Sequence, residues 1–131
     1  MYLIDTNIWL ERLLNQEKSE EVRRFLDSVP SENLYITDFT LHSIGVILHR
    51  LKKLNALIKF VQDIFINGKV NLVHLGAIDM LRVVDVMKDF NLDFDDAYQY
   101  VAAEKYDLII ISFDKDFDRT KKGRKLPSDI F

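Results

Sequence analysis

The sequence predicts an α/β fold in which helices cover both faces of a central parallel sheet of four to five strands. Short apolar runs of strand length alternate along the chain with longer stretches whose apolar residues recur at helical spacing. The run at 108–111 is apolar throughout, as in a strand that is buried on both faces. Since strands that alternate with helices pair in parallel, these observations indicate a sheet between two helical layers.

The chain has 131 residues, which is close to the common size of one domain. It contains no internal repeat, low-complexity segment or linker, so we expect a single domain over 1–131. Because 48% of the residues are hydrophobic, a sizeable hydrophobic core can form without disulfides or a structural metal. The absence of cysteine excludes a disulfide framework and a thiolate metal site.

The hydropathy and the net charge of the chain argue against several classes of protein. No apolar run approaches the roughly 18–20 residues that span a membrane, and the N-terminus lacks the pattern of a signal peptide. We therefore expect a cytoplasmic protein without membrane contact. The net charge of −3 is not typical of a nucleic-acid binder, although basic residues gather within 119–125.

The predicted elements follow one another with short connections. Strands are expected at 2–5, 34–37, 70–73 and 108–111. Helices are expected directly after the first strand and at 18–29, 38–53, 56–66, 76–90 and 93–105, with Asn55 as an interruption. The last residues, 126–131, are expected to add a short edge strand, where proline is tolerated.

Caps and apolar faces can also be assigned. Thr6 or Asn7 is expected to cap the first helix, and Thr37 or Asp38 the helix after the second strand. Gly68 suits the left-handed position at a helix C-terminus. In the helix at 76–90, one apolar residue recurs at every third position, which predicts a buried face. Its members are Ile78, Leu81, Val84, Met87 and Phe90.

Aspartates stand at three corresponding points of the predicted fold. Asp5 ends the first strand, Asp114 follows the strand at 108–111, and Asp96 lies in the first turn of the helix between them. Ligands bind at the carboxyl ends of strands in open α/β sheets. Carboxylate oxygens without cysteine suit Mg²⁺ or Mn²⁺. Each aspartate alone is equally well explained as a loop residue, a helix-dipole partner or an N-cap.

Two segments resemble the PIN-domain family, especially its VapC-type toxin ribonucleases. They are YLIDTNIWL at the start and LDFDDAYQYVAAEKYDLIIISFDKDF near the end. The resemblance implies a three-layer α/β/α domain that cleaves RNA with Mg²⁺ or Mn²⁺. It places the metal on Asp5, Asp96 and Asp114, with Asp116 as a further catalytic residue. Family members are commonly homodimers, and VapC-type members are often neutralised by a small antitoxin protein.

The resemblance also indicates residues that support the site, and at one position this chain differs from the family pattern. Thr6 and Asn7 fall in the first-turn motif, and Ser112 falls where the family often has an orienting hydroxyl. Ser43 stands where the family usually has a metal-site glutamate. Asp38, His42 or a water would then have to take the place of this glutamate in the metal site. Otherwise the chemistry of the site is altered. The alternative function is therefore a weakened or inactive PIN-like module that binds RNA or a protein partner.

RNA contacts are expected at the basic segment near the C-terminus, because phosphate contacts dominate nucleic-acid affinity. The candidates are Arg119, Lys121, Lys122, Arg124 and Lys125. Trp9 and Tyr98 are candidates for base stacking, with core packing as the plainer interpretation. A phosphoacceptor or phosphatase domain is a third class, but a haloacid-dehalogenase-like site needs two aspartates flanking one residue, and this chain has Asp5-Thr6-Asn7.

Overall fold

The computed structural model describes all residues, 1–131. The strands are β1 (Tyr2–Ile4), β2 (Leu34–Thr37), β3 (Asn71–Val73) and β4 (Ile109–Ile111). The helices are α1 (Thr6–Leu13), α2 (Ser19–Ser28), α3 (Asp38–Arg50), α4 (Leu54–Val61), α5 (Asp79–Phe90) and α6 (Phe94–Tyr106). A π-helical turn η2 (Gln62–Ile66) extends α4, and short 3-10 turns lie at η1 (Ser31–Asn33), η3 (Lys115–Arg119) and η4 (Pro127–Asp129).

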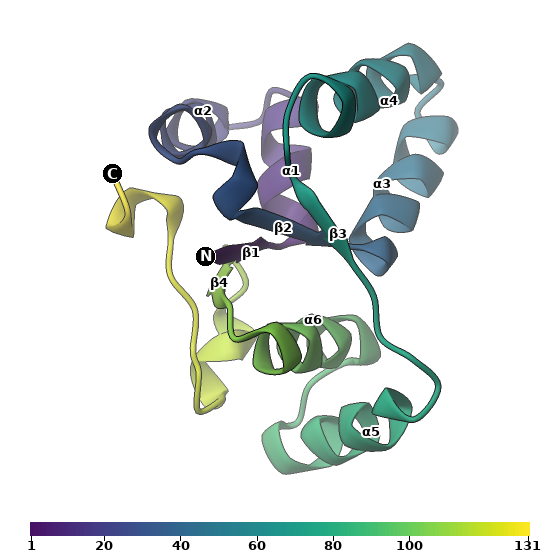
Figure 1. Cartoon of the computed structure of the whole chain (residues 1–131), viewed down its shortest axis with the longest axis vertical. Helices are drawn as coiled ribbons and strands as arrows, with labels where there is room; N and C mark the ends of the chain where they lie inside the picture. Colours follow the sequence, from purple (N-terminus) through teal and green to yellow (C-terminus); the bar gives the residue numbers. More distant parts are fainter.

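The sheet has four strands in the order β3-β2-β1-β4, and every pair is parallel. Helices α1 to α4 lie on one side of it and α5 and α6 on the other (Figure 1). The predicted three-layer α/β/α fold with a parallel sheet is confirmed. None of the helices has the length and apolar character needed to cross a membrane.

Both faces of the sheet are buried, as the unbroken apolar strands predict. Leu3 and Ile110 belong to a core cluster shared with α5 and α6. Their chain neighbours Ile4 and Ile111 belong to a second cluster shared with α1 to α4. Because successive side chains of a strand point to opposite faces, one apolar run supplies both cores.

The residues that cap helices α1 and α3 lie at the carboxyl ends of strands β1 and β2. The hydroxyl of Thr37 accepts a hydrogen bond from Thr40 N at 3.0 Å, so Thr37 caps α3 as predicted. Helix α1 is capped by Asp5, whose Oδ1 accepts from Thr6 N at 2.8 Å. The prediction of Thr6 or Asn7 as the cap was wrong, because the extended backbone of Asp5 lets the helix begin at Thr6.

The buried face of α5 differs from the predicted one. The first predicted residues are exposed, and Val83 and Val86 are buried instead. Three residues turn an α-helix by about 300°, so an apolar series with a strict spacing of three drifts by about 60° at each step. Only the last two members, Met87 and Phe90, pack against the core. The exposed members are Ile78 at 82%, Leu81 at 72% and Val84 at 44%.

Three turn predictions were also wrong. Gly68 is not left-handed; glycine is needed there because a Cβ would lie 2.7 Å from the carbonyl oxygen of Asp63. Helices α3 and α4 separate before Asn55, around Lys52, which adopts a φ of 58°. The C-terminus forms the turn η4 rather than an edge strand, and only Lys125 makes a single bridge to β4.

Candidate metal centre

The predicted aspartates meet in one cleft at the carboxyl edge of the sheet. Asp5 follows β1, Asp114 follows β4, and Asp96 lies in the first turn of α6, which returns to the same edge. The cleft has a volume of about 300 Å³. Its walls also include α1 and α3, and the residues that line it are Asp5, Thr6, Asn7, Leu10, Phe39, Ser43, Ile47, Asp95, Asp96, Gln99 and Asp114.

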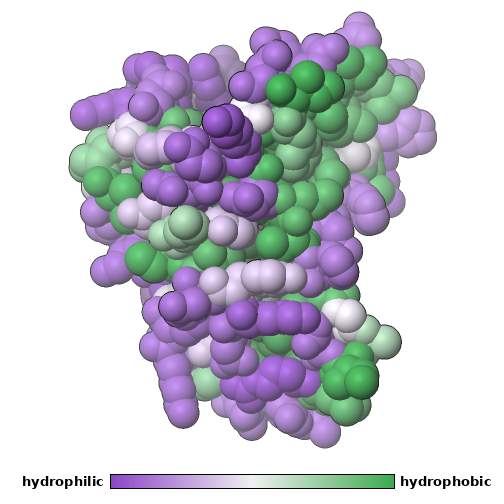
Figure 2. Space-filling model, viewed as in Figure 1, coloured by the Kyte–Doolittle hydropathy of each residue, from purple (hydrophilic) through white to green (hydrophobic).

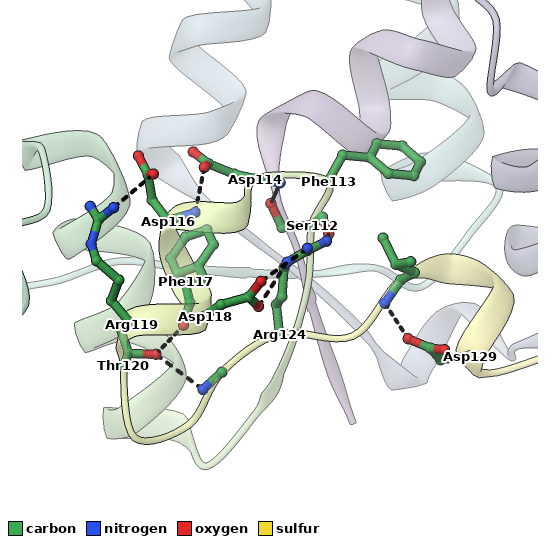
Figure 3. Close-up of polar contacts among 12 residues, drawn as sticks. Ser112, Phe113, Asp114, Asp116, Phe117, Asp118, Arg119, Thr120, Arg124 and Asp129 are labelled. Atoms are coloured by element: carbon green, nitrogen blue, oxygen red, sulfur yellow. Dashed lines mark hydrogen bonds and ion pairs between the residues drawn. The ribbon is translucent and has the colours of Figure 1, made fainter.

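Three carboxylates converge closely enough to share a cation. One oxygen each of Asp96, Asp114 and Asp116 lies within 4.8 Å of the others. Asp114 and Asp116 point to the same side of η3, whereas Asp118 points away toward Arg124 (Figure 3). The local cause is the cap of η3, where Asp114 Oδ1 accepts from Asp116 N at 2.9 Å. An all-oxygen donor set of this kind fits Mg²⁺ or Mn²⁺.

Asp5 is buried beneath this group and is held by four donors. Its Oδ1 accepts from Thr6 N at 2.8 Å and Gln99 Nε2 at 3.0 Å. Its Oδ2 accepts from Ser112 Oγ at 2.6 Å and, more weakly, from Asn7 Nδ2 at 3.3 Å. Burial raises the pKa of Asp5, although these hydrogen bonds oppose the shift. The predicted supporting residues Thr6, Asn7 and Ser112 therefore all contact Asp5.

Asp96 lies among other carboxylates that disfavour its charged form. Partial burial is the largest cause, and together with the neighbouring Asp114 and the charges of Asp5 and Asp95 it raises the pKa of Asp96 to about 8. Crowded carboxylates of this kind stay partly protonated unless a cation neutralises them. The donor set therefore fits a divalent ion by charge as well as by chemistry.

Comparison with known proteins identifies the family to which the chain belongs. Residues 2–123 match the sequence profile of the PIN domain. The chain belongs to the PIN-domain family. Comparison with curated proteins gives no match.

Solved structures with a PIN fold resemble the whole chain. A toxin–antitoxin complex from Klebsiella pneumoniae matches with 20% identity and a TM-score of 0.78, over 97% of this chain and 98% of that chain. The sarcin-ricin-loop-cleaving toxin VapC20 of Mycobacterium tuberculosis matches with 17% identity and a TM-score of 0.81, over 97% and 100%. FitAcB from Neisseria gonorrhoeae matches with 20% identity and a TM-score of 0.80, over 98% and 99%. At these identities the likeness establishes the fold.

The cleft has a neutral residue, Ser43, at the position where the sequence motif led us to expect a glutamate. Ser43 lines the cleft from α3. Asp38 does not line it, because its Oδ1 accepts from Tyr98 Oη at 2.7 Å and from Phe39 N at 2.9 Å. His42 is exposed and lines a different groove, between α3 and α4. Neither side chain replaces the expected glutamate in the cleft.

The basic segment after the PIN aspartates divides into two groups. Arg119 donates to the carbonyl oxygens of Phe90 at 3.0 Å and Asn91 at 2.6 Å. Arg124 donates to Asp118 and to the carbonyl oxygen of Ser112. Both arginines therefore hold the segment against the domain. In contrast, Lys121, Lys122 and Lys125 are exposed and form no ion pair.

Two predicted aromatic contacts resolve to core packing. Trp9 and Tyr98 are 3% and 6% exposed, and each belongs to a core cluster. Trp9 packs edge-on against Phe60 with ring centroids 5.3 Å apart. Neither ring is available for stacking on a base.

Sequence reasoning missed Gln99, which contacts Asp5 from α6. The available signal was its position three residues after Asp96, which places both side chains on neighbouring parts of one helix face. Thr37 and Thr40 were also missed as members of the site. Thr37 ends β2 and caps α3, Thr40 lies in the first turn of α3, and both hydroxyls are fully buried and bond to Gln99.

Proposed function

We propose that this chain is a metal-dependent endoribonuclease and the toxin component of a toxin–antitoxin pair. The observation that carries the proposal is the convergence of Asp96, Asp114 and Asp116 above the buried Asp5. Members of the PIN family are in general nucleases, and the structural likeness includes a toxin that cleaves the sarcin-ricin loop.

Each carboxylate has a distinct part in the proposed site. Asp96 and Asp114 would hold Mg²⁺ or Mn²⁺ from α6 and from the turn after β4. Asp5 would join them as a ligand, and the hydrogen bond that it accepts from Asn7 is its weakest, at 3.3 Å. Asp116, whose side chain is 43% exposed, would act beside the substrate. The bound ion supplies activation of water and neutralises charge at the phosphodiester.

The proposed RNA path runs over the basic segment beside η3. Lys121, Lys122 and Lys125 guide the phosphate backbone, since their charges are exposed and unpaired. Arg119 and Arg124 add their charge while fixing the segment to α5 and β4. Binding should therefore weaken with rising salt.

Apolar surface is available for the proposed antitoxin and for a second copy of the chain. It lies over the start of α5 and, separately, over α3 and α4 (Figure 2). A groove of about 480 Å³ between α3 and α4 is lined mainly by apolar side chains. Exposed apolar patches of this kind mark interaction sites. We propose that the antitoxin and a second copy of the chain bind at these two apolar surfaces.

One observation favours the alternative function, a weakened PIN module that binds RNA or a protein partner. Ser43 brings no charge to the cleft, and neither Asp38 nor His42 replaces the missing carboxylate. A site with fewer carboxylates holds a divalent ion less tightly.

RNA cleavage by wild type and by Asp96→Asn tests the proposal. A mixed RNA panel is incubated with Mn²⁺, with Mg²⁺ and with chelator. Asp85→Asn is the matched control, because Asp85 is exposed on α5 and outside the acidic group. We expect metal-dependent cleavage by wild type and Asp85→Asn, and none by Asp96→Asn. Absence of cleavage by wild type, together with no rise in Tm on adding Mn²⁺, would establish the binding module instead.

A further inference from the structure

A buried polar network lies beneath the proposed metal centre, centred on the side chain of Gln99. Gln99 is 2% exposed, and Thr37 and Thr40 are fully buried. Its Nε2 donates to Asp5 Oδ1 at 3.0 Å and to Thr40 Oγ1 at 2.8 Å. Its Oε1 accepts from Thr37 Oγ1 at 2.7 Å. One amide therefore joins α6, the end of β1 and the first turn of α3.

The direction of these hydrogen bonds is fixed. Thr37 Oγ1 accepts from Thr40 N as the cap of α3, so its proton is free to donate to the Gln99 carbonyl. A flipped amide would turn its oxygen toward the Asp5 carboxylate, and both acceptors would then repel each other. A glutamate at position 99 would bring another anion to a cleft that already holds Asp5, Asp96 and Asp114. Glutamine is the residue of this length that donates to Asp5 without adding charge.

The contacts of Asp5 show what this amide determines. Its Oδ1 is occupied by Gln99 and by Thr6 N. Its Oδ2 bonds to Ser112 Oγ, which in turn accepts from Asp114 N at 2.9 Å, so Oδ2 lies on the Asp114 side. Holding Oδ1 on the side of α3 and α6 thus keeps Oδ2 on the side of Ser112 and Asp114.

We propose that Gln99 is a positioning residue of the metal centre, which fixes Asp5 so that one chosen oxygen faces the cation. This inference rests on the proposed function. The residue acts through Asp5 and touches neither the ion nor the RNA. Outer hydrogen-bond partners of metal ligands orient them in this way, and their loss typically costs 10- to 100-fold in metal affinity or activity.

A purely structural role predicts a different outcome. In that case replacing Gln99 would remove one hydrogen bond from each of the buried hydroxyls of Thr37 and Thr40 and lower the stability of the chain. The folded protein would still bind the ion with its original affinity. The two roles therefore separate in metal affinity, measured under conditions where every variant is folded.

The test is a double-mutant cycle of Gln99→Met with Asp5→Asn, with Mn²⁺ as the probe. Free Mn²⁺ is followed by electron paramagnetic resonance during titration of each folded protein, and RNA cleavage gives kcat and KM separately. Gln62→Met is the matched control, because Gln62 is exposed and its side chain makes no hydrogen bond. Circular dichroism confirms that each variant is folded at the temperature used.

We expect Gln99→Met to raise the Mn²⁺ dissociation constant by about tenfold or more and to lower kcat without a matching rise in KM. In the Asp5→Asn background the same change should have no further effect, and Gln62→Met should bind like wild type. Unchanged Mn²⁺ affinity in folded Gln99→Met, or full additivity with Asp5→Asn, overturns the positioning role alone. Wild type that binds no Mn²⁺ overturns the proposed function as well.

Discussion

One carboxylate oxygen of Asp96 and one of Asp114 lie within 4.8 Å of each other, although Asp96 lies at the start of α6 and Asp114 follows β4. Such a pair cannot carry two full negative charges at low cost, because like charges at this separation repel strongly. The charge of the cleft in the metal-free protein should therefore depend on pH, because the pKa of Asp96 is raised.

The metal-free protein should lose stability as the pH rises. The pKa of Asp96 is raised from 3.8 to about 8 in the folded state, so between these values the folded state binds more protons than the unfolded state. Its contribution is therefore complete at acidic pH and is lost as the pH rises toward 8. Thermal unfolding in chelator across this range should show a falling Tm, and a smaller fall in Asp96→Asn.

A control separates this effect from other carboxylates. Ion pairs with Lys105 and Arg82 lower the pKa values of Asp79 and Glu104, so these groups affect stability at the acidic end of the range. Saturating Mn²⁺ should raise the Tm most at the alkaline end. Parallel pH profiles for wild type and Asp96→Asn would contradict the raised pKa.

Two glycines should respond oppositely to alanine. A Cβ at Gly68 would lie 2.7 Å and 2.8 Å from backbone carbonyl oxygens of the preceding π turn, so Gly68→Ala should destabilise the protein by about 1–3 kcal/mol. A Cβ at Gly45, within α3, meets only Leu57 at 3.9 Å. Gly45→Ala should stabilise by about 0.5–1 kcal/mol through helix propensity. Urea denaturation measures both changes, and equal signs would show that the turn can relax.

Arg119 and Lys122 should differ although both belong to the basic segment. Arg119 bonds to two carbonyl oxygens at the end of α5, so Arg119→Ala should cost about 1–2 kcal/mol of stability. Lys122 is exposed and unpaired, and Lys122→Ala should change stability by less than about 0.5 kcal/mol while weakening RNA binding. Denaturation and filter binding at two salt concentrations distinguish them. A stability loss in Lys122→Ala would place it among the structural residues.

Phe117 should be the costliest truncation of the segment after β4. It is fully buried in the cluster formed with α5 and α6. Phe117→Ala should therefore cost about 3–5 kcal/mol, because it removes a buried ring and leaves a cavity. Phe94→Ala is the comparison, since that ring is 41% exposed. A similar loss in both variants, measured by denaturation, would indicate that η3 collapses around the cavity.

The elements were predictable where the local pattern is strong. The isoleucines of β4 and the periodic residues of α2 are short-range signals, and the structure contains both elements near the expected bounds. Helix α5 was predicted with the wrong face, because a spacing of three does not match the 3.6-residue turn. The end of the chain was predicted as a strand because local sequence does not show that Lys125 makes only one bridge.

The candidate site was predictable in composition but not in arrangement. The family motifs pointed to Asp5, Asp96, Asp114 and Asp116 as one group. They did not show that Asp5 is buried whereas the other three are partly exposed. Nor did they show that donors from three segments bind the carboxylate of Asp5. The spacing of Gln99 from Asp96 indicated a shared helix face, but its contact with Asp5 could not be predicted, because the two residues are 94 positions apart.

The sequence by itself determined the layers and the edge at which chemistry is possible. Alternating apolar runs and helical periodicities fix a parallel sheet between helices, and such sheets gather the ends of their strands at one edge. Only the tertiary structure decided which atoms meet there. Hydrogen bonds between distant residues depend on packing to within a fraction of an ångström, so the orientation of Asp5 and the pairing of Asp96 with Asp114 arise only when all three layers are assembled.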